Sequence, residues 1–169
     1  MTSPAPIWRR CAAAFYDGLL LLGLWMVALV VDTIVRDLVG LDRNWAALRA
    51  YLFLVGLGFF GWSWTHGGQT LGMRSWRLRV QRSDGAPLRW LDAALRYAVM
   101  LLCWGVALTP ALLQVPQLAS RPHAATIRAA ALIALAMGLL WTLLDARRRA
   151  PQDRLSGTEL VWLPPARTG

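Results

Sequence analysis

Lysine is absent from this sequence, and all 18 of its basic residues are arginines, set against nine acidic residues. Charge of either sign is scarce, because charged residues fill only 16% of the 169 positions, compared with about 25% in soluble domains. Hydrophobic residues make up 57% of the chain. Such a chain is poorly solvated in water unless its few charges are gathered in loops. The composition therefore predicts a membrane protein whose arginines lie outside the lipid.

Motifs of enzymes and metal sites are missing as well. Without lysine there can be no phosphate-binding GK[ST] loop, and no HExxH, CxxC or GxSxG motif occurs. Cys11 and Cys103 have neither metal-binding nor redox spacing, and we expect both to be free. His66 and His123 fall on opposite sides of the topology predicted below, so they cannot share a site. We therefore expect no enzyme, no metal and no cofactor.

Four apolar stretches are each long enough for a helix to cross a bilayer, which takes about 20 residues. We place these spans at about residues 11–31, 47–65, 95–113 and 124–144. Arg9 and Arg10 precede the first stretch as in a signal peptide, but no small-x-small cleavage site follows it, so we expect an uncleaved span. The predicted fold class is an all-α membrane protein with a four-helix transmembrane bundle.

Arginine is divided unevenly between the two sides of this topology. The N-terminal segment, the loop at about 66–94 with its flank, and the C-terminal tail together hold thirteen arginines, whereas the other two loops hold five. Positively charged loops are retained on the cytoplasmic side of a membrane. We therefore expect both termini and the 66–94 loop to be cytoplasmic.

Two segments on that side have the alternating pattern of β-strands. Residues 76–81 alternate apolar and polar side chains before a Ser83-Asp84-Gly85 turn, and residues 159–162 are also strand-like. We predict that they meet in a small cytoplasmic strand-and-loop cap. Its arginines either contact anionic lipid headgroups or form a solvated polar face. Because the positive charge is spread over membrane-flanking loops, it gives no sign of nucleic-acid binding.

Asp17 is the most informative residue of the first span, because an ionisable side chain inside a span is costly and marks a function or a specific pairing. Arg10 lies two turns earlier on the same helix face, and Asp92 and Arg96 have the i,i+4 spacing of a helical ion pair. These four side chains predict a cluster near the cytoplasmic face. We favour a structural ion-pair network over a cation or proton site, since nearby arginines would repel a cation.

Two motifs, RCAAAFYD from Arg10 to Asp17 and DRLSGT from Asp153, resemble those of the RDD family of bacterial membrane proteins, which is named for one arginine and two aspartates. The segment RCAAAFYD, from Arg10 to Asp17, is similar to the family's opening R-x-x-A-x-x-x-D. The segment DRLSGT, which begins at Asp153, is similar to its closing D-x-x-x-G-T. The resemblance thus assigns the arginine of the name to Arg10 and the aspartates to Asp17 and Asp153.

The central segment GQTLGMR is similar to the family's G-x-T-x-G-K-R loop, and Arg96 matches a basic position farther along the chain. The matching loop positions are Gly68, Thr70, Gly72 and Arg74. The chain departs from the family pattern at two places. Met73 stands where the family often has lysine, and Gln152 stands where a histidine often precedes the aspartate.

The resemblance covers about residues 8–162 and implies one transmembrane domain in a bacterial plasma (inner) membrane, with flexible ends at 1–7 and 163–169. Many members of the family have three predicted spans rather than the four expected here. The resemblance also implies that Arg10, Asp17 and Asp153 meet near the cytoplasmic face. We expect Arg10 to pair with one or both aspartates and so to anchor the tail to the bundle.

Two functions stay open at this point. One is a structural or interaction component of a membrane assembly, supported by the ion-pair cluster and by a glycine packing face of span two, namely Gly56, Gly58 and Gly61. The other is a secondary transporter of cations, of the sodium/proton exchange type suggested for some family members, or of small solutes, with Asp17 as its ion-site candidate. Expected partners are the lipid bilayer, anionic headgroups, and either a second copy of the chain or another membrane protein.

Overall fold

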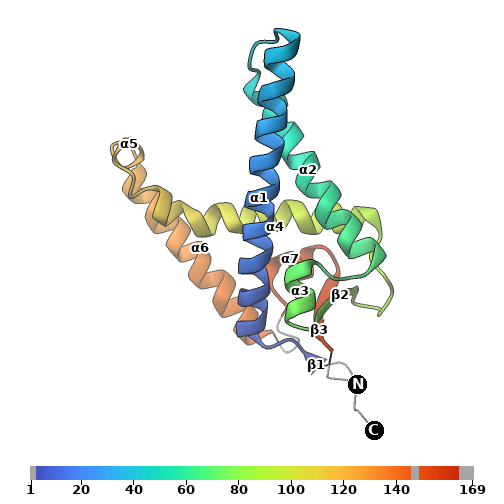
Figure 1. Ribbon diagram of the computed structural model, residues 1–169. Coiled ribbons are helices and arrows are strands. Elements are labelled where there is room, and N and C mark those ends of the chain that lie inside the picture. Colours follow the sequence, from blue (N-terminus) through green and yellow to red (C-terminus); the bar gives the residue numbers. More distant parts are fainter. Residues whose placement is uncertain (1–2, 146–148, 164–169) are drawn as a thin grey trace.

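The computed structural model describes residues 3–145 and 149–163. Within these residues, four helices are long and apolar enough to cross a membrane: α1 (Ile7–Val39), α2 (Trp45–His66), α4 (Trp90–Leu112) and α6 (Ala124–Leu144). The helices α1 and α2 form an antiparallel hairpin, α4 crosses this hairpin, and α6 runs back from the far end of α4 (Figure 1). The predicted all-α membrane fold with four apolar helices is confirmed.

Shorter elements form a cap against the N-terminal half of α1 (Figure 1). They are β1 (Ser3–Pro4), α3 (Leu71–Ser75), β2 (Leu78–Arg82), α7 (Pro151–Leu155) and β3 (Thr158–Trp162). The three strands make one antiparallel sheet in the order β1-β3-β2, in which Leu78 lies opposite Trp162. A further short helix, α5 (Pro116–Ala119), lies between α4 and α6. We call α3, α7 and the three strands the cap.

The predicted meeting of two strand-like segments is confirmed, because β2 and β3 pair along their whole length. The flexibility expected for residues 1–7 stays a prediction, but residues 3–7 lie in contact with the rest of the protein. Ser3 and Pro4 pair with the outer edge of β3, Ala5 is fully buried, and α1 begins at Ile7. Of the expected flexible end at 163–169, residues 164–169 lie outside the described part of the chain.

The first helix is longer than its predicted span, since α1 continues beyond residue 31 to Val39. An ion pair of 2.8 Å between Asp32 and Arg36, one helical turn apart, lets this polar stretch remain helical. The helix ends at Gly40, whose φ of +70° is the left-handed conformation that glycine adopts at low cost. The fall in hydropathy near residue 31 therefore marks the end of the apolar segment, whereas the helix itself continues to Val39.

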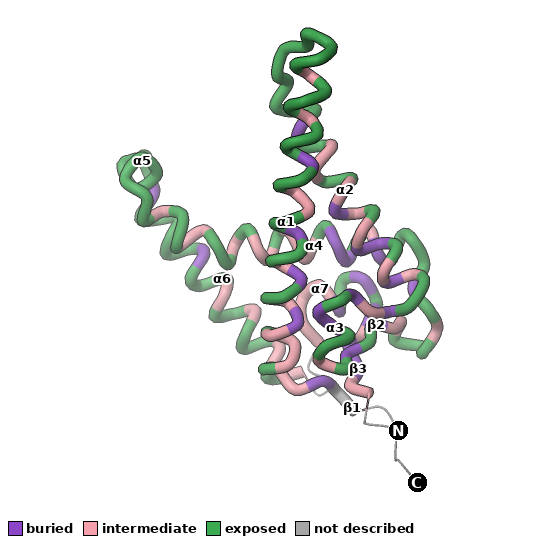
Figure 2. The backbone as a smooth tube through the Cα atoms, viewed as in Figure 1, coloured by how far each residue is buried: buried purple, intermediate pink, exposed green. Residues whose placement is uncertain are grey.

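The core lies where α2 and α4 meet the cap, and it contains Phe60, Trp64, Tyr97, Leu78 and Val80. Figure 2 shows buried residues gathered at this junction, whereas the far half of the α1–α2 hairpin and most of α6 are exposed. Exposed apolar helix surface of this extent is expected where lipid takes the place of water. The core therefore supports the junction between the cap and the long helices.

The predicted glycine packing face of α2 is confirmed at two of its three positions. A Cβ atom at Gly56 would overlap the hydroxyl of Tyr97, and one at Gly61 would collide with the ring of Trp90. Gly58 faces open space instead. The small residues thus let aromatic side chains of α4 lie against α2.

Candidate functional site

Asp153 is the centre of a buried ion-pair network at the junction of the cap and the long helices. Its Oδ2 lies 2.8 Å from Nη1 of Arg10, and its Oδ1 lies 2.5 Å from Nη1 of Arg96. Asp153 is 1% exposed and stands in the first turn of α7, where it also accepts a 3.0 Å hydrogen bond from the backbone N–H of Ala150. One carboxylate therefore connects α1, α4 and α7, and we call these three charged residues the clamp.

Arg96 extends the clamp to the sheet. Its Nη1 donates a 2.7 Å hydrogen bond to Oγ1 of Thr158, the first residue of β3. Its guanidinium also lies over the ring of Trp64, 5.3 Å from the centroid, in the geometry of a cation–π contact. Arg96 is 4% exposed, so these partners stand in for the water that a buried guanidinium has lost.

Arg10 also contacts the sheet and the segment before α1, through two backbone carbonyl groups. Its Nε donates to the carbonyl of Ala5 and its Nη2 donates to the carbonyl of Leu160, at 3.3 and 3.2 Å. The start of α1 is thereby held against β3 and against the segment that leads into α1. The N-terminal segment, α4 and the C-terminal part of the chain are therefore held together by one set of charges.

Asp17 belongs to a second, separate set of contacts. Its Oδ2 accepts a 2.6 Å hydrogen bond from the hydroxyl of Thr70, and its Oδ1 accepts a 3.0 Å bond from the backbone N–H of Gly72. The same Thr70 hydroxyl accepts from the N–H of Met73 and so caps α3. Among the described residues, no arginine forms an ion pair with Asp17. Asp17 thereby binds α3 to α1.

The clamp confirms part of the predicted cluster and corrects the rest. Arg10 pairs with Asp153 as expected, but it forms no ion pair with Asp17. Asp92 does not pair with Arg96 either, because its carboxylate accepts from the backbone N–H of Arg89 at the start of α4 and lies 3.7 Å from Arg82. Helix capping competes for a carboxylate in the first turn, so i,i+4 spacing alone does not determine the partner of Asp92.

The motif loop, which we define as residues 68–74, contains two glycines with distinct structural roles and one exposed arginine. Gly68 has a φ of +68°, and its carbonyl accepts a 2.7 Å bond from the N–H of Val80. At Gly72 a Cβ atom would lie 2.6 Å from Oδ1 of Asp17. Arg74 is exposed and takes no part in the clamp. Backbone shape and close approach therefore account for the glycines of this loop.

Gly72→Ala is expected to lower stability by about 1–3 kcal/mol, the usual cost of overpacking. The added methyl group would also lie 2.7 Å from the backbone carbonyl of Ala13 in α1, which cannot move aside easily. Gly105→Ala is the matched control, since a Cβ there meets nothing within 4 Å. Thermal unfolding in detergent measures both variants, and equal midpoints would contradict the proposed close approach of α3 to α1.

Two residues that contact Arg96 were not singled out as site residues from the sequence. Thr158 ends the closing motif, which was a usable signal, since a threonine beside a buried charge is a ready hydrogen-bond partner. Trp64 stands near the end of the second predicted span, where tryptophans often lie at a membrane surface, yet it is 1% exposed and lies in the core. Nothing in its sequence position distinguishes a tryptophan at a membrane surface from one beneath a cap.

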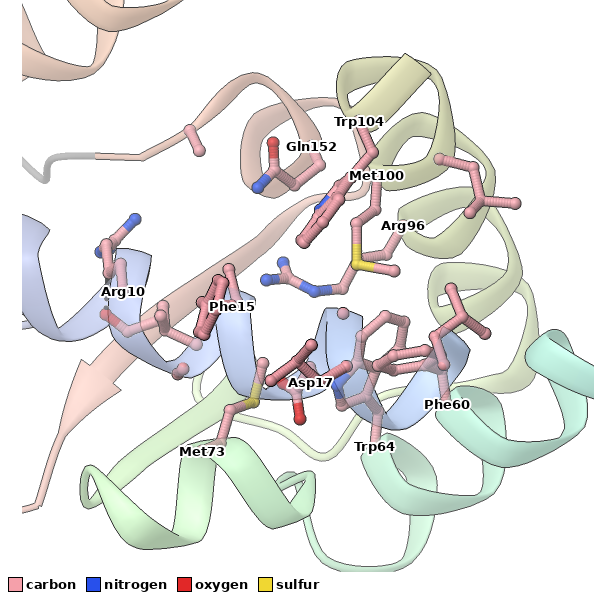
Figure 3. Close-up of a pocket in the computed structure, with 18 of the residues that line it drawn as sticks. Arg10, Phe15, Asp17, Phe60, Trp64, Met73, Arg96, Met100, Trp104 and Gln152 are labelled. Atoms are coloured by element: carbon pink, nitrogen blue, oxygen red, sulfur yellow. Dashed lines mark hydrogen bonds between the residues drawn. The ribbon is translucent and has the colours of Figure 1, made fainter. Parts of the chain in front are cut away.

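A cavity of about 600 Å³ opens beside the clamp. Figure 3 shows Arg10, Asp17 and Arg96 among its lining side chains, together with apolar side chains that include Phe15, Phe60 and Trp104. Met73 and Gln152, the two departures from the family pattern, also line it. Most of the wall is apolar, and among the described residues no three His, Cys, Asp or Glu side chains are grouped so that they could hold a metal ion.

The family assignment follows from a comparison that covers most of the chain. A sequence model described as the RDD family matches residues 4–157. No curated protein and no solved structure matches the chain. The matched region begins before Arg10, includes Asp17 and the motif loop, and extends past Asp153, so every residue of the clamp falls inside it. The chain therefore belongs to the RDD family.

Proposed function

We propose that this membrane protein acts as a structural or interaction component of a membrane assembly and is not an enzyme. The observation that supports this role is the use of the buried charges. Asp153 holds Arg10 and Arg96, and Asp17 holds Thr70 and Gly72. All four charged side chains join segments of the chain to one another, which favours a protein that presents a fixed cap beside the membrane.

The proposed setting is a bacterial plasma membrane with the cap and both termini in the cytoplasm. The excess of arginine in the segments that form and flank the cap supports this orientation. Arg74, Arg77, Arg79 and Arg89 are exposed on or beside the cap. Exposed arginines close to a membrane surface attract anionic headgroups, which are the proposed lipid partners.

Anionic lipid is accordingly expected to stabilise the protein more than zwitterionic lipid does. Replacing Arg74, Arg77 and Arg79 together by glutamine should remove most of that difference, because each arginine near an anionic surface contributes about 1 kcal/mol. Thermal unfolding in vesicles of phosphatidylcholine with and without phosphatidylglycerol measures the effect. A matched triple replacement of Arg43, Arg49 and Arg121, which are exposed outside the cap, serves as control. Equal losses in the two variants would contradict a headgroup-binding cap.

The second candidate function is secondary transport of a cation. One observation favours it: Asp17 is 5% exposed, lines the cavity and forms no ion pair with an arginine of the described residues. Its weakness is the apolar wall, since ion pathways through membranes are lined by polar side chains or backbone groups. Both oxygens of Asp17 are also already used as acceptors.

Proton flux in proteoliposomes separates the two functions. Full-length protein would be reconstituted around a pH-sensitive dye and given pulses of sodium, potassium or lithium, with Asp17→Asn as the comparison. An assembly role predicts flux equal to that of protein-free liposomes for both proteins. Cation-dependent flux that Asp17→Asn abolishes would instead establish the transporter, provided that the variant keeps the wild-type thermal midpoint.

The assembly itself has a direct measure. Protein extracted from its own membrane in a mild detergent should migrate as a complex of defined stoichiometry, well above its own mass of 18.8 kDa after the detergent is subtracted. The complex contains either further copies of this chain or a second membrane protein. A monomer in several mild detergents and in native nanodiscs would contradict the proposed role.

A further inference from the structure

The cavity beside the clamp is polar at one end and apolar at the other. Along α1 its lining runs from Arg10 and Asp17 to Leu22 and Trp25, and along α4 it begins at Arg96 and continues through apolar residues. On α1 this distance is about 22 Å at 1.5 Å per residue. The cavity volume of about 600 Å³ falls in the range of about 300–1,000 Å³ that is typical of small-molecule sites. An elongated amphiphile fits this division of polarity.

The polar end contains two buried donors without an acceptor. Nε of Arg96 and Nε1 of Trp64 have no hydrogen-bond partner among the described residues, although both side chains are at least 95% buried and line the cavity. Figure 3 shows the Arg96 guanidinium between Met100 and Trp104 on one side and Trp64 and Asp17 on the other. Buried donors are nearly always paired in proteins, so the geometry calls for an acceptor oxygen from outside the chain.

The charge balance at this end selects the kind of acceptor. Arg10 and Arg96 carry two positive charges, and Asp17 and Asp153 carry two negative charges when ionised, so their formal sum is zero. A free carboxylate or phosphate would add an uncompensated buried charge, which is strongly unfavourable in such surroundings. An uncharged carbonyl oxygen satisfies the donors without that cost.

The cavity also opens towards the lipid. Phe15, Leu19, Leu22 and Leu108 line it and are at the same time 63%, 52%, 55% and 49% exposed. On apolar spans such exposed side chains contact the bilayer, where phospholipid is the most abundant amphiphile. We infer that the cavity holds one acyl chain of a membrane glycerophospholipid, whose ester carbonyl accepts hydrogen bonds from Arg96 and Trp64. This site is independent of the function proposed above.

Photolabelling of the full-length protein in vesicles tests the inference. A phosphatidylcholine with a diazirine on one acyl chain would be incorporated, irradiated, and its adducts located by peptide mass spectrometry. Residues of the cavity wall, such as Leu22 and Leu108, should be labelled several-fold more than Val27, an apolar residue of the same span that is 63% exposed and outside the cavity. Equal labelling would mean that lipid only surrounds the protein, and it would overturn the proposal.

Three variants sharpen the test. Gly105 lines the cavity and has open space before it, so Gly105→Trp should fill the cavity and abolish the excess labelling. Gly58→Trp is the control, since Gly58 has the same open surroundings on α2 away from the cavity. Trp64→Phe removes one donor and should lower the excess labelling of the wall residues about threefold to tenfold. Excess labelling that survives Gly105→Trp would overturn the proposal.

Competition identifies the source of the acyl chain. Unlabelled phosphatidylcholine should displace the label from the wall residues, whereas oleate at equal concentration should not. Displacement by oleate alone would overturn the phospholipid assignment. Wall residues that stay unlabelled but crosslink to a second copy of the chain would overturn it as well, because the cavity would then be filled by protein.

Discussion

Asp153→Ala is expected to lower the free energy of unfolding by about 3–5 kcal/mol, the usual cost of removing one partner from a buried ion pair. The substitution leaves Arg10 and Arg96, whose side chains are only 10% and 5% exposed, without the counter-ion that they share. It also removes the acceptor for the N–H of Ala150 at the start of α7. Thermal unfolding in detergent should show a lower midpoint, and protease should cut the C-terminal segment faster.

The control for this experiment is Asp37→Ala, which removes the same charge from an exposed position of α1 and should change stability little. A double-mutant cycle adds a second check. Because Arg10 and Asp153 share one ion pair, the losses from Arg10→Ala and Asp153→Ala should not add. Additive losses, or a C-terminal segment as protease-resistant as in the wild type, would show that the clamp does not hold the cap.

Asp17→Ala is the second substitution with a large expected effect. It removes the acceptor for the hydroxyl of Thr70 and for the N–H of Gly72, and each buried group left unsatisfied costs about 1–3 kcal/mol. Asp17→Asn should cost much less. Its amide oxygen can accept from Gly72, and its amide nitrogen can donate to the oxygen of Thr70.

This pair of variants separates shape from charge at Asp17. Thermal midpoints measured side by side should fall in the order wild type, Asp17→Asn, Asp17→Ala, with the larger step at alanine. If Asn and Ala were equally destabilising, the negative charge itself would be required and the hydrogen-bond account would be wrong. The order also shows whether Asp17→Asn is sound enough for the flux measurement.

The spans and the two long strands were predictable because each depends on a local pattern. A run of apolar residues suffices to place α2, α4 and α6, and alternation from Trp76 to Gln81 suffices for β2. The partner of Arg10 was harder, since Asp153 lies 143 positions away. Only the family resemblance brought the two together, and the structure shows that Arg10 pairs with Asp153.

The remaining errors have physical causes that a single sequence does not display. Asp92 has two local uses, a helix cap and an i,i+4 pair, and the choice between them depends on where α4 begins. The cavity depends on how far α1 and α4 are held apart by the ring of Trp104, which fills the space beside Gly18. Separation between helices is set by packing over the whole core, so it has no signature in any one segment.

The clamp has a consequence for biosynthesis. The ribosome makes Arg10 and Arg96 before their counter-ion, and Arg96 precedes Asp153 by 57 positions. Until that aspartate emerges, the nascent protein carries two arginines at a site that can be buried only once they are neutralised. Completion of the last segment therefore closes the fold, and a chain cut short before Asp153 would keep a polar, poorly packed junction. Quality-control proteases act on such incompletely folded chains, so unfinished copies would be removed.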